Sequence, residues 1–317
     1  MPFITGENLH SVVTQRENDV WIVGDFGIIY YSGNNGISWK KQETRTENNL
    51  NRAYFINNQN GWVCGLLGTV LHTSNGGKTW EQQKSNTQRH LFAIHFIDGN
   101  NGCAVGDWGT VITTADGGNT WKSVMPEVDV GYNDVFFPDL KHGWIVGEFG
   151  TILHTSDGGK TWRPQVCKDI EPPAQEEEYV MPKPTLYGVL FKDNNKGWIS
   201  GIAGILLATE DGGINWKRIP SDTTYSIYSI LAHGARGWAV GAEGNYLMTE
   251  NGGKIWKKKD DAIKNRFWFR GLSFRDEKDG FVVGARGLVV HTKDGGDTWE
   301  MLSGISYEVP EVKMPEF

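Results

Sequence analysis

The sequence predicts an all-β protein, a seven-bladed β-propeller of four-stranded blades. Three observations support this: a unit of about 40 residues recurs along the 317-residue chain, each unit holds short β-rich runs divided by glycine-containing turns, and each ends in one turn motif. The clearest copy, residues 143–162, reads GWIVGEFGTILHTSDGGKTW. The seven copies end at Trp39, Trp80, Trp121, Trp162, Trp216, Trp256 and Trp299.

Each unit begins with a hairpin and ends in a turn. In the clearest copy, residues 144–146 and 151–154 are β-rich and flank a turn at 147–150, which predicts two antiparallel strands. In the closing turn we expect the Asp157 carboxylate to accept backbone N–H groups two or three residues on, Gly159 to take a positive φ, and Trp162 to be buried. The turn positions equivalent to 157 are Asn34, Asn75, Asp116, Asp157, Asp211, Asn251 and Asp294.

A further β-rich run before each hairpin, such as residues 132–137, completes four strands per unit, and the fourth strand follows the final tryptophan. The predicted blades are residues 9–42, 50–84, 91–125, 132–165, 186–220, 227–259 and 269–302, within one domain of residues 1–317. An insertion at 165–184, rich in proline and glutamate, and a tail at 303–317 lie outside them.

The first and last repeats are in phase, so the ring closes by packing of blades 1 and 7 or by an edge strand from residues 2–4 or 307–317. The first turn differs, with Asn34-Asn35-Gly36 where the others have Gly-Gly, as terminal repeats often do.

Composition excludes several classes of protein. A net charge of −7 and a pI near 5.7 argue against a general nucleic-acid-binding surface. The three cysteines, Cys64, Cys103 and Cys167, lack the spacing of a disulfide framework or a zinc site, and we expect two buried thiols and one loop thiol. Neither a metal nor a cofactor is indicated. Since no apolar run reaches about 18 residues and the N-terminus does not resemble a signal peptide, the chain is expected to be soluble and not membrane-spanning.

The turn motif resembles the Asp-box, or BNR, repeat: a Ser or Thr, an Asp or Asn two residues on, a Gly two further, and then Thr-Trp, as in residues 155–162. Coupled to a preceding Gly-Trp-x-x-Gly-x-x-Gly, as in residues 143–150, it is most similar to the photosystem II stability and assembly factor family and its bacterial relatives. The resemblance covers about residues 9–302. It implies a propeller with a protein-binding or assembly role, in an exported or periplasmic location if a signal has been removed and otherwise a cytoplasmic one.

Catalysis finds little support in the residues. Arg218-Ile219-Pro220 matches a sialidase motif but follows the fifth Asp-box, where that motif should precede the first. Asp25, Asp107, Glu148 and Glu243 lie in the turns between second and third strands and could supply a carboxylate pair for glycoside hydrolysis, which needs a separation of about 5 to 9.5 Å. Water-facing turns favour acids in any case, so no pair stands out.

Residues that break the repeat columns are the better candidates for recognition. Trp108 occupies a turn position that Phe26, Leu67 and Phe149 share in blades 1, 2 and 4, whereas blades 5 to 7 have Ala203, Glu243 and Arg286 there. The second position of the innermost strand varies between amides, aromatics and Arg270, and Arg52 interrupts a column of small residues. The predicted partner-binding set is Asp25, Phe26, Arg52, Asp107, Trp108, Glu148, Phe149, Tyr187, Tyr228, Arg266, Trp268, Arg270 and Arg286. We expect a non-catalytic scaffold that binds a protein or peptide segment, and the alternative is a glycan-binding or glycan-cleaving propeller on the same face.

Overall fold

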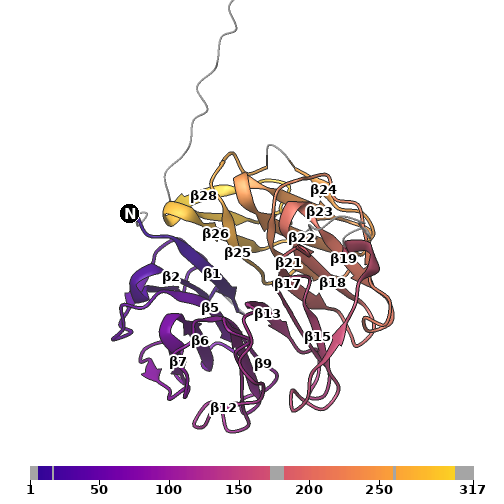
Figure 1. The fold of residues 1–317 in the computed structure, drawn as a ribbon. Coiled ribbons are helices and arrows are strands. Elements are labelled where there is room, and N and C mark those ends of the chain that lie inside the picture. Colours follow the sequence, from indigo (N-terminus) through magenta and orange to yellow (C-terminus); the bar gives the residue numbers. More distant parts are fainter. Residues whose placement is uncertain (1–5, 16–17, 172–181, 260–261, 304–317) are drawn as a thin grey trace, which may run out of the picture.

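Seven antiparallel sheets of four strands stand around a central axis and form the predicted seven-bladed propeller (Figure 1). The computed structural model describes residues 6–15, 18–171, 182–259 and 262–303. The blades are numbered 1 to 7 in chain order, and each is a continuous stretch of chain whose strands are neighbours in sequence order. The ends of the ring, blade 1 in indigo and blade 7 in yellow, lie side by side (Figure 1).

The strands repeat the same four positions in every blade. The innermost strands are β1 (Leu9–Thr14), β5 (Leu50–Phe55), β9 (Leu91–Phe96), β13 (Tyr132–Phe136), β17 (Leu186–Phe191), β21 (Ile227–His233) and β25 (Phe269–Phe274). The second strands are β2 (Val20–Gly24), β6 (Gly61–Gly65), β10 (Gly102–Gly106), β14 (Gly143–Gly147), β18 (Gly197–Gly201), β22 (Arg236–Gly241) and β26 (Gly280–Gly284). The third strands are β3 (Ile29–Ser32), β7 (Val70–Thr73), β11 (Val111–Thr114), β15 (Ile152–Thr155), β19 (Leu206–Thr209), β23 (Tyr246–Thr249) and β27 (Val289–Thr292). The outer strands are β4 (Lys40–Gln42), β8 (Glu81–Gln82), β12 (Lys122–Ser123), β16 (Arg163–Gln165), β20 (Lys217–Arg218), β24 (Lys257–Lys258) and β28 (Glu300–Ser303).

The second strands form the core of the ring. They read as near-continuous apolar runs because both of their faces pack against neighbouring blades, and in β14 all five residues are buried. The tryptophan of this strand ties one blade to the next: Trp62 of blade 2 stacks on Phe96 of blade 3 at a centroid distance of 3.6 Å and donates its Nε1–H to the Gly117 carbonyl at 3.0 Å. Burial of these tryptophan side chains between blades therefore stabilises the propeller.

The Asp-box turns connect third and outer strands, and one face of the ring, the box face, carries all of them. In blade 4, Thr155 Oγ1 accepts the N–H groups of Asp157 and Gly159, and Asp157 Oδ1 accepts the N–H of Thr161 at 2.9 Å. The carboxylate also interacts with the backbone N–H of Lys160 at the predicted span of three residues, and the bond to Thr161 spans four. Gly159 has the predicted positive φ of 82°. The ring of Trp162 is only half-buried, although its Nε1 atom is fully buried.

The turns between second and third strands lie on the opposite face, the turn face, at the end where the innermost strands begin. Five form short 3₁₀ turns, namely η1 (Asp25–Gly27), η2 (Leu66–Gly68), η4 (Ile202–Gly204), η5 (Ala242–Gly244) and η6 (Ala285–Gly287). In blade 1 the N–H of Asp25 donates to the Asn8 carbonyl at 3.0 Å, and the equivalent backbone bond forms in all seven blades at 2.9–3.1 Å. Backbone hydrogen bonds of this kind are shared by the turns of all seven blades.

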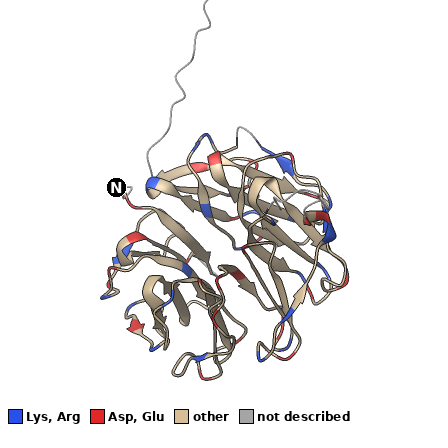
Figure 2. Cartoon of the chain, in the orientation of Figure 1, with Lys and Arg blue, Asp and Glu red and all other residues tan. Residues whose placement is uncertain are grey.

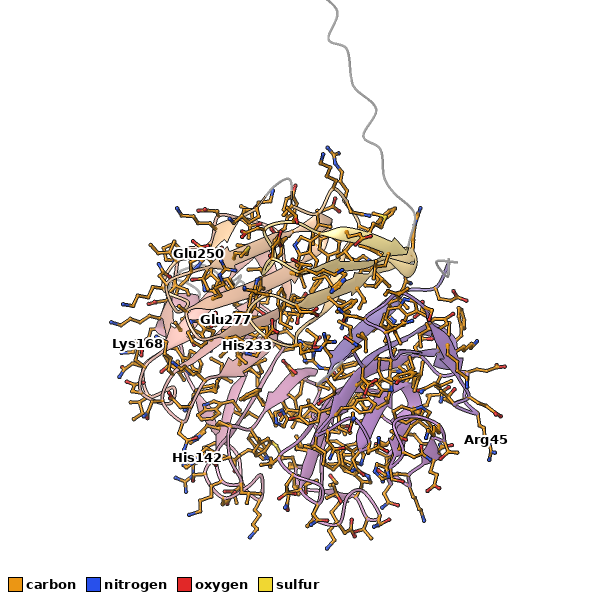
Figure 3. The ribbon with its side chains drawn as sticks, turned by 180° about the vertical axis from the view of Figure 1, so that it is seen from behind. Arg45, His142, Lys168, His233, Glu250 and Glu277 are labelled. Atoms are coloured by element: carbon orange, nitrogen blue, oxygen red, sulfur yellow. The ribbon has the colours of Figure 1, made fainter. Side chains whose placement is uncertain are left out.

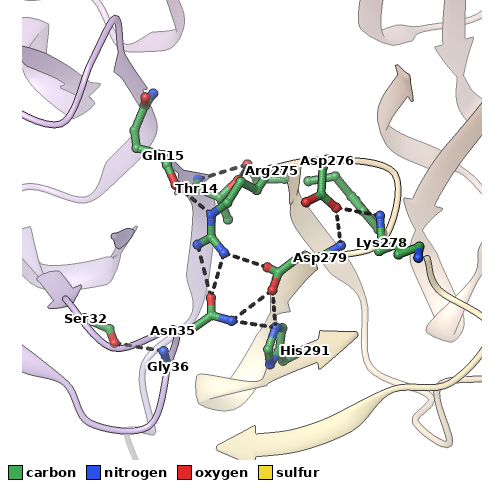
Figure 4. Close-up of polar contacts among 12 residues, drawn as sticks. Thr14, Gln15, Ser32, Asn35, Gly36, Arg275, Asp276, Lys278, Asp279 and His291 are labelled. Carbon is green, nitrogen blue, oxygen red and sulfur yellow. Dashed lines mark hydrogen bonds and ion pairs between the residues drawn. The ribbon is translucent and has the colours of Figure 1, made fainter. Parts of the chain in front are cut away.

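Side chains of blades 1 and 7 pack together where the ring closes, as one of the alternatives from the sequence expects (Figure 4). Asn35 of the degenerate first Asp-box sits in the left-handed region with φ 57°. Its Nδ2 donates to Asp279 Oδ2 at 2.9 Å, and its Oδ1 accepts from both terminal nitrogens of Arg275 at 3.1 Å. His291 Nε2 lies 3.3 Å from Asn35 Nδ2. Residues 2–4 and 307–317, the alternative closing strands, lie outside the described residues.

The insertion between blades 4 and 5 is described at its two ends only. Residues 165–171 include η3 (Lys168–Ile170), in which Ile170 is buried and Lys168 points outward at the edge of the ring (Figure 3). Cys167 lies in a loop, as expected, but it is buried and its thiol donates to the Trp216 carbonyl. Burial raises the pKa of the Cys64 thiol to about 12.

The charges of the ring are intermixed. Lysines, arginines and acids alternate around the outer edge, with no single-sign block in the view of Figure 2. In the described part of the chain, none of the helices has the length and hydropathy needed to cross a membrane.

Candidate partner-binding face

The turn face carries a row of large exposed apolar side chains on successive blades. The exposed fractions are 66% for Phe26, 58% for Leu67, 44% for Trp108 and 53% for Phe149. Each has φ between 52° and 54°, in the left-handed region that bulky residues rarely adopt. We call these four residues, on blades 1 to 4, the apolar arc. Blades 5 to 7 have the same backbone with Ala203, Glu243 and Arg286, so the backbone does not require an apolar side chain there.

Interactions from neighbouring blades support the arc. The N–H of Phe26 donates to Asn49 Oδ1 at 3.0 Å, and that of Leu67 to His90 Nδ1 at 3.1 Å. The Arg89 guanidinium carbon lies 4.7 Å from the centroid of the Trp108 ring. These contacts fix the turns while leaving the ends of the side chains exposed.

The innermost strands surround a channel along the central axis. A second group of predicted residues lies around the mouth of this channel on the turn face. Tyr187 and Tyr228 meet edge to face with centroids 5.1 Å apart, and the Arg270 guanidinium lies 5.8 Å from the Tyr228 ring. The Arg270 side chain is exposed, yet the many protein atoms around it desolvate the guanidinium and lower its pKa, and the nearby charge of Arg52 lowers it further. Trp268 is half-buried and stacks on His10 with a centroid distance of 6.0 Å.

The other two predicted arginines lie at this side of the ring but have different surroundings. Arg266 is exposed. The Arg286 guanidinium lies over the Phe267 ring at 4.7 Å. The backbone N–H of Arg286 donates to Asn8 Oδ1 at 3.2 Å across the junction between blades 7 and 1. The mouth therefore combines aromatic rings with cations, and it lies next to the apolar arc, where Arg89 covers the Trp108 ring.

Two of the acids once considered for hydrolysis are occupied in holding the turns. Asp25 accepts from the backbone and side chain of Asn8 at 3.2 and 2.9 Å, and from His10 Nε2 at 2.7 Å. Glu148 Oε2 accepts the Gly131 N–H at 2.7 Å. Asp107 Oδ1 is buried without a hydrogen-bond partner among the described residues. Glu243 occupies the same left-handed position as Phe26, one residue later than the other acids. Among the described residues, no hydrogen bond links any two of these four acids.

Arg52 belongs to the interior of the channel. Its Nη2 lies 2.5 Å from Asp134 Oδ1, which joins blade 2 to blade 4, and Asp134 Oδ2 accepts the Val189 N–H of blade 5 at 3.1 Å. The Asp134 charge raises the pKa of Arg52. Both line a cavity of about 460 Å³ that also contacts Tyr54, His95 and Lys192 near the box face. The cavity wall holds a neutral imidazole, because burial lowers the pKa of His95 to about 3.

Sequence reasoning missed two contributors to this face. Leu67 was recognised in the turn column but not included in the predicted set, although it extends the arc across blade 2. Arg89, which lies over Trp108 and pairs with Glu127 at 2.8 Å, comes from a connection between blades that has no repeat pattern. Only the three-dimensional arrangement identifies it.

Comparison with known proteins identifies the family. The model of a family described as photosynthesis system II assembly factor YCF48 matches residues 3–74, 121–226 and 222–311. The chain belongs to the YCF48 family. No curated protein sequence matches it.

Solved structures of YCF48 proteins share this fold. One, described as YCF48 bound to D1 peptide, has a TM-score of 0.71 and 18% identity and covers 92% of this chain and 95% of its own. YCF48 from Cyanidioschyzon merolae has a TM-score of 0.73 and 18% identity, with 92% and 97% covered. An ancestral GH74 enzyme has a TM-score of 0.70 and 15% identity, and this chain covers 47% of it. At these identities the likeness shows the fold alone.

Proposed function

We propose that this chain is a non-catalytic scaffold of the YCF48 family that binds a segment of another protein on its turn face. The apolar arc carries the proposal, because four successive blades place a large apolar residue where the backbone conformation disfavours one and where its side chain stays exposed. The described partner of a relative, a D1 peptide, and the family's description as an assembly factor support the same reading.

The arrangement suggests how a segment is held. Apolar side chains of the partner pack along Phe26, Leu67, Trp108 and Phe149, while acidic groups meet the cations beside the channel mouth, such as Arg270. The exposed part of Trp108 makes it the strongest single anchor. The glycan alternative has no such support, because Asp25 and Glu148 already hold the protein's own turns.

The test removes the arc without disturbing its backbone. Asparagine tolerates the left-handed region, so a triple variant with Phe26→Asn, Leu67→Asn and Phe149→Asn keeps the turns while removing apolar surface. The matched control is Ile214→Asn, a similarly exposed residue (79%) on the box face. With D1 peptide as the first probe and a peptide array as the second, fluorescence anisotropy should show at least tenfold weaker binding for the triple variant and no change for the control. Peptides bound equally by both variants, or no bound peptide in either assay, would contradict the proposal.

A further inference from the structure

The junction between blades 3 and 4 lacks the ring that fills the other junctions. Five blades have tryptophan in the second strand and blade 7 has Phe281, but blade 3 has Cys103. At four junctions this tryptophan stacks on a phenylalanine of the next blade with centroids 3.5–4.1 Å apart. Three of these indoles, on Trp21, Trp62 and Trp238, donate to the first glycine carbonyl of the next Asp-box.

A cavity of about 180 Å³ occupies the place of the missing indole. Its lining includes Cys103, Thr113, Phe137 and Gly158. In blade 2 the equivalent positions surround Trp62: His72 stacks on one side of its ring, Phe96 on the other, and Gly117 accepts its N–H. Phe137 and Gly158 thus stand where Phe96 and Gly117 contact Trp62, whereas Thr113 replaces the stacking His72, and Cys103 is too small to fill the space.

A buried donor beside this cavity also lacks the acceptor that it has in other blades. At three junctions a glutamine in or directly after the preceding outer strand accepts the Nε1–H of the Asp-box tryptophan, as Gln42 does for Trp80 at 2.9 Å and Gln83 for Trp121 at 3.2 Å. Blade 3 has Val124 at this position. Trp162 Nε1 is consequently buried without a partner among the described residues, and its ring packs on Phe137 of the cavity wall.

We propose that this cavity is a binding site for an indole ring. The ring would stack on Phe137, as the native indoles do on their phenylalanines, and its N–H would donate to the Gly158 carbonyl. The volume of about 180 Å³ is enough for one aromatic ring system, since an apolar cavity of about 150 Å³ holds benzene, and here polar side chains such as Lys122 and Lys160 border the site. The site lies on the box face, so it is independent of the peptide-binding face proposed above.

Titration with free indole tests the site. We expect the wild-type Tm to rise by roughly 2 °C at an indole concentration about tenfold above its Kd. N-methylindole, which lacks the donor, should bind about threefold to tenfold more weakly. N-acetyltryptophanamide is the second arm: binding by it assigns the site to a tryptophan side chain of a partner, and binding by indole alone assigns it to a small molecule.

Two substitutions fill the cavity. Cys103→Trp restores the residue of the other blades, and Cys103→Phe, with the residue of blade 7, covers the case in which the larger ring fails to fold. Both should abolish the indole-dependent shift and raise the Tm of the free protein. Wild-type protein without a shift up to the solubility limit of indole, or a filled variant that binds indole as tightly as wild type, would overturn the proposal.

Val124→Gln provides the matched control. Because Gln42 and Trp21 coexist at the first junction, a glutamine here should satisfy Trp162 Nε1 and leave the cavity open. We expect a higher Tm for the free protein and an unchanged affinity for indole. Loss of indole binding in this variant would show that the orphaned donor, and not the slot formed by Phe137 and Gly158, holds the ring, and would contradict the proposal.

Discussion

The two faces of the propeller repeat in different ways. On the box face, the same side-chain bonds recur in all seven turns, from Ser32 and Asn34 in blade 1 to Thr292 and Asp294 in blade 7. On the turn face, backbone bonds and a left-handed residue recur, while the side chain changes from Phe26 to Glu243. Where side chains make the turn, they are nearly constant along the chain; where the backbone makes it, the side chain at the left-handed position varies from blade to blade.

The largest expected effect concerns the packing between blades. Trp62 is almost fully buried, stacks on Phe96 and bonds Gly117, so Trp62→Ala should lower the free energy of unfolding by about 3 to 5 kcal/mol. Chemical denaturation measures it, with exposed Ile214→Ala as a control that should change stability by less than about 0.5 kcal/mol. An unchanged denaturation midpoint would mean that blade packing does not hold the ring.

The next effect should appear in binding instead of stability. Trp108→Ala removes the exposed anchor of the apolar arc, and we expect about 2 kcal/mol weaker peptide binding, roughly thirtyfold. Its stability should change by no more than about 1 kcal/mol, because nearly half of the ring is exposed. Arg270→Ala should weaken the same complex. A Trp108→Ala protein that melts as early as Trp62→Ala would remove the distinction between the faces.

The next effect in size is expected at the junction between blades 1 and 7, the seam of the ring. Asn35→Gly relieves the left-handed conformation but deletes the bonds to Arg275 and Asp279, and we expect a net loss of about 1 to 2 kcal/mol. Arg45 is the control: it also has a positive φ of 55° and projects from the outer edge of blade 1 (Figure 3). Arg45→Gly should be neutral or stabilising by up to about 1 kcal/mol. Equal effects of the two changes in thermal melts would contradict a closing role for Asn35.

The smallest effect separates aspartate from asparagine within the Asp-boxes. Hydrogen bonds from the Thr161 side chain and backbone lower the pKa of Asp157 to about 2. A lowered folded-state pKa adds stability that is present above the unfolded value near 4 and disappears as the pH falls toward 2. Near pH 7, Asp157→Asn should therefore be less stable than wild type, and the difference in stability should be smaller at pH 2. Between pH 4 and 2 the stability of the variant should fall less steeply than that of wild type. Parallel stability curves across that window would contradict this reading.

Side chains that build the fold could be identified from the sequence, and side chains that act across the ring could not. Asp157 and Trp162 recur at fixed spacing, which predicts the turns and the blade count. Arg52 stood out as an exception in a small-residue column, yet its pairing with Asp134 depends on where blades 2 and 4 lie around the axis.

The same limit applies to the missing indole and to the seam. Cys103 visibly interrupts the tryptophan column, but the cavity depends also on Val124 and on the packing of the next blade. From the sequence, Asn35 was interpreted as part of a degenerate terminal repeat. In the structure its side-chain amide forms hydrogen bonds with Arg275 and Asp279. Repeat patterns predict the interactions that recur in every blade, and they do not predict interactions that form at a single junction between blades.

The closure by blades 1 and 7 has a consequence during synthesis. Every other junction joins segments that follow one another in the chain, but the apolar side of blade 1 around Val12 and Ile22 packs on Phe281 and Val283, which are made last. At about 5 to 20 residues per second, this surface waits on the order of 15 to 50 s on the ribosome before its cover emerges. Nascent chains halted before blade 7 should consequently be the species that chaperones bind and proteases cut.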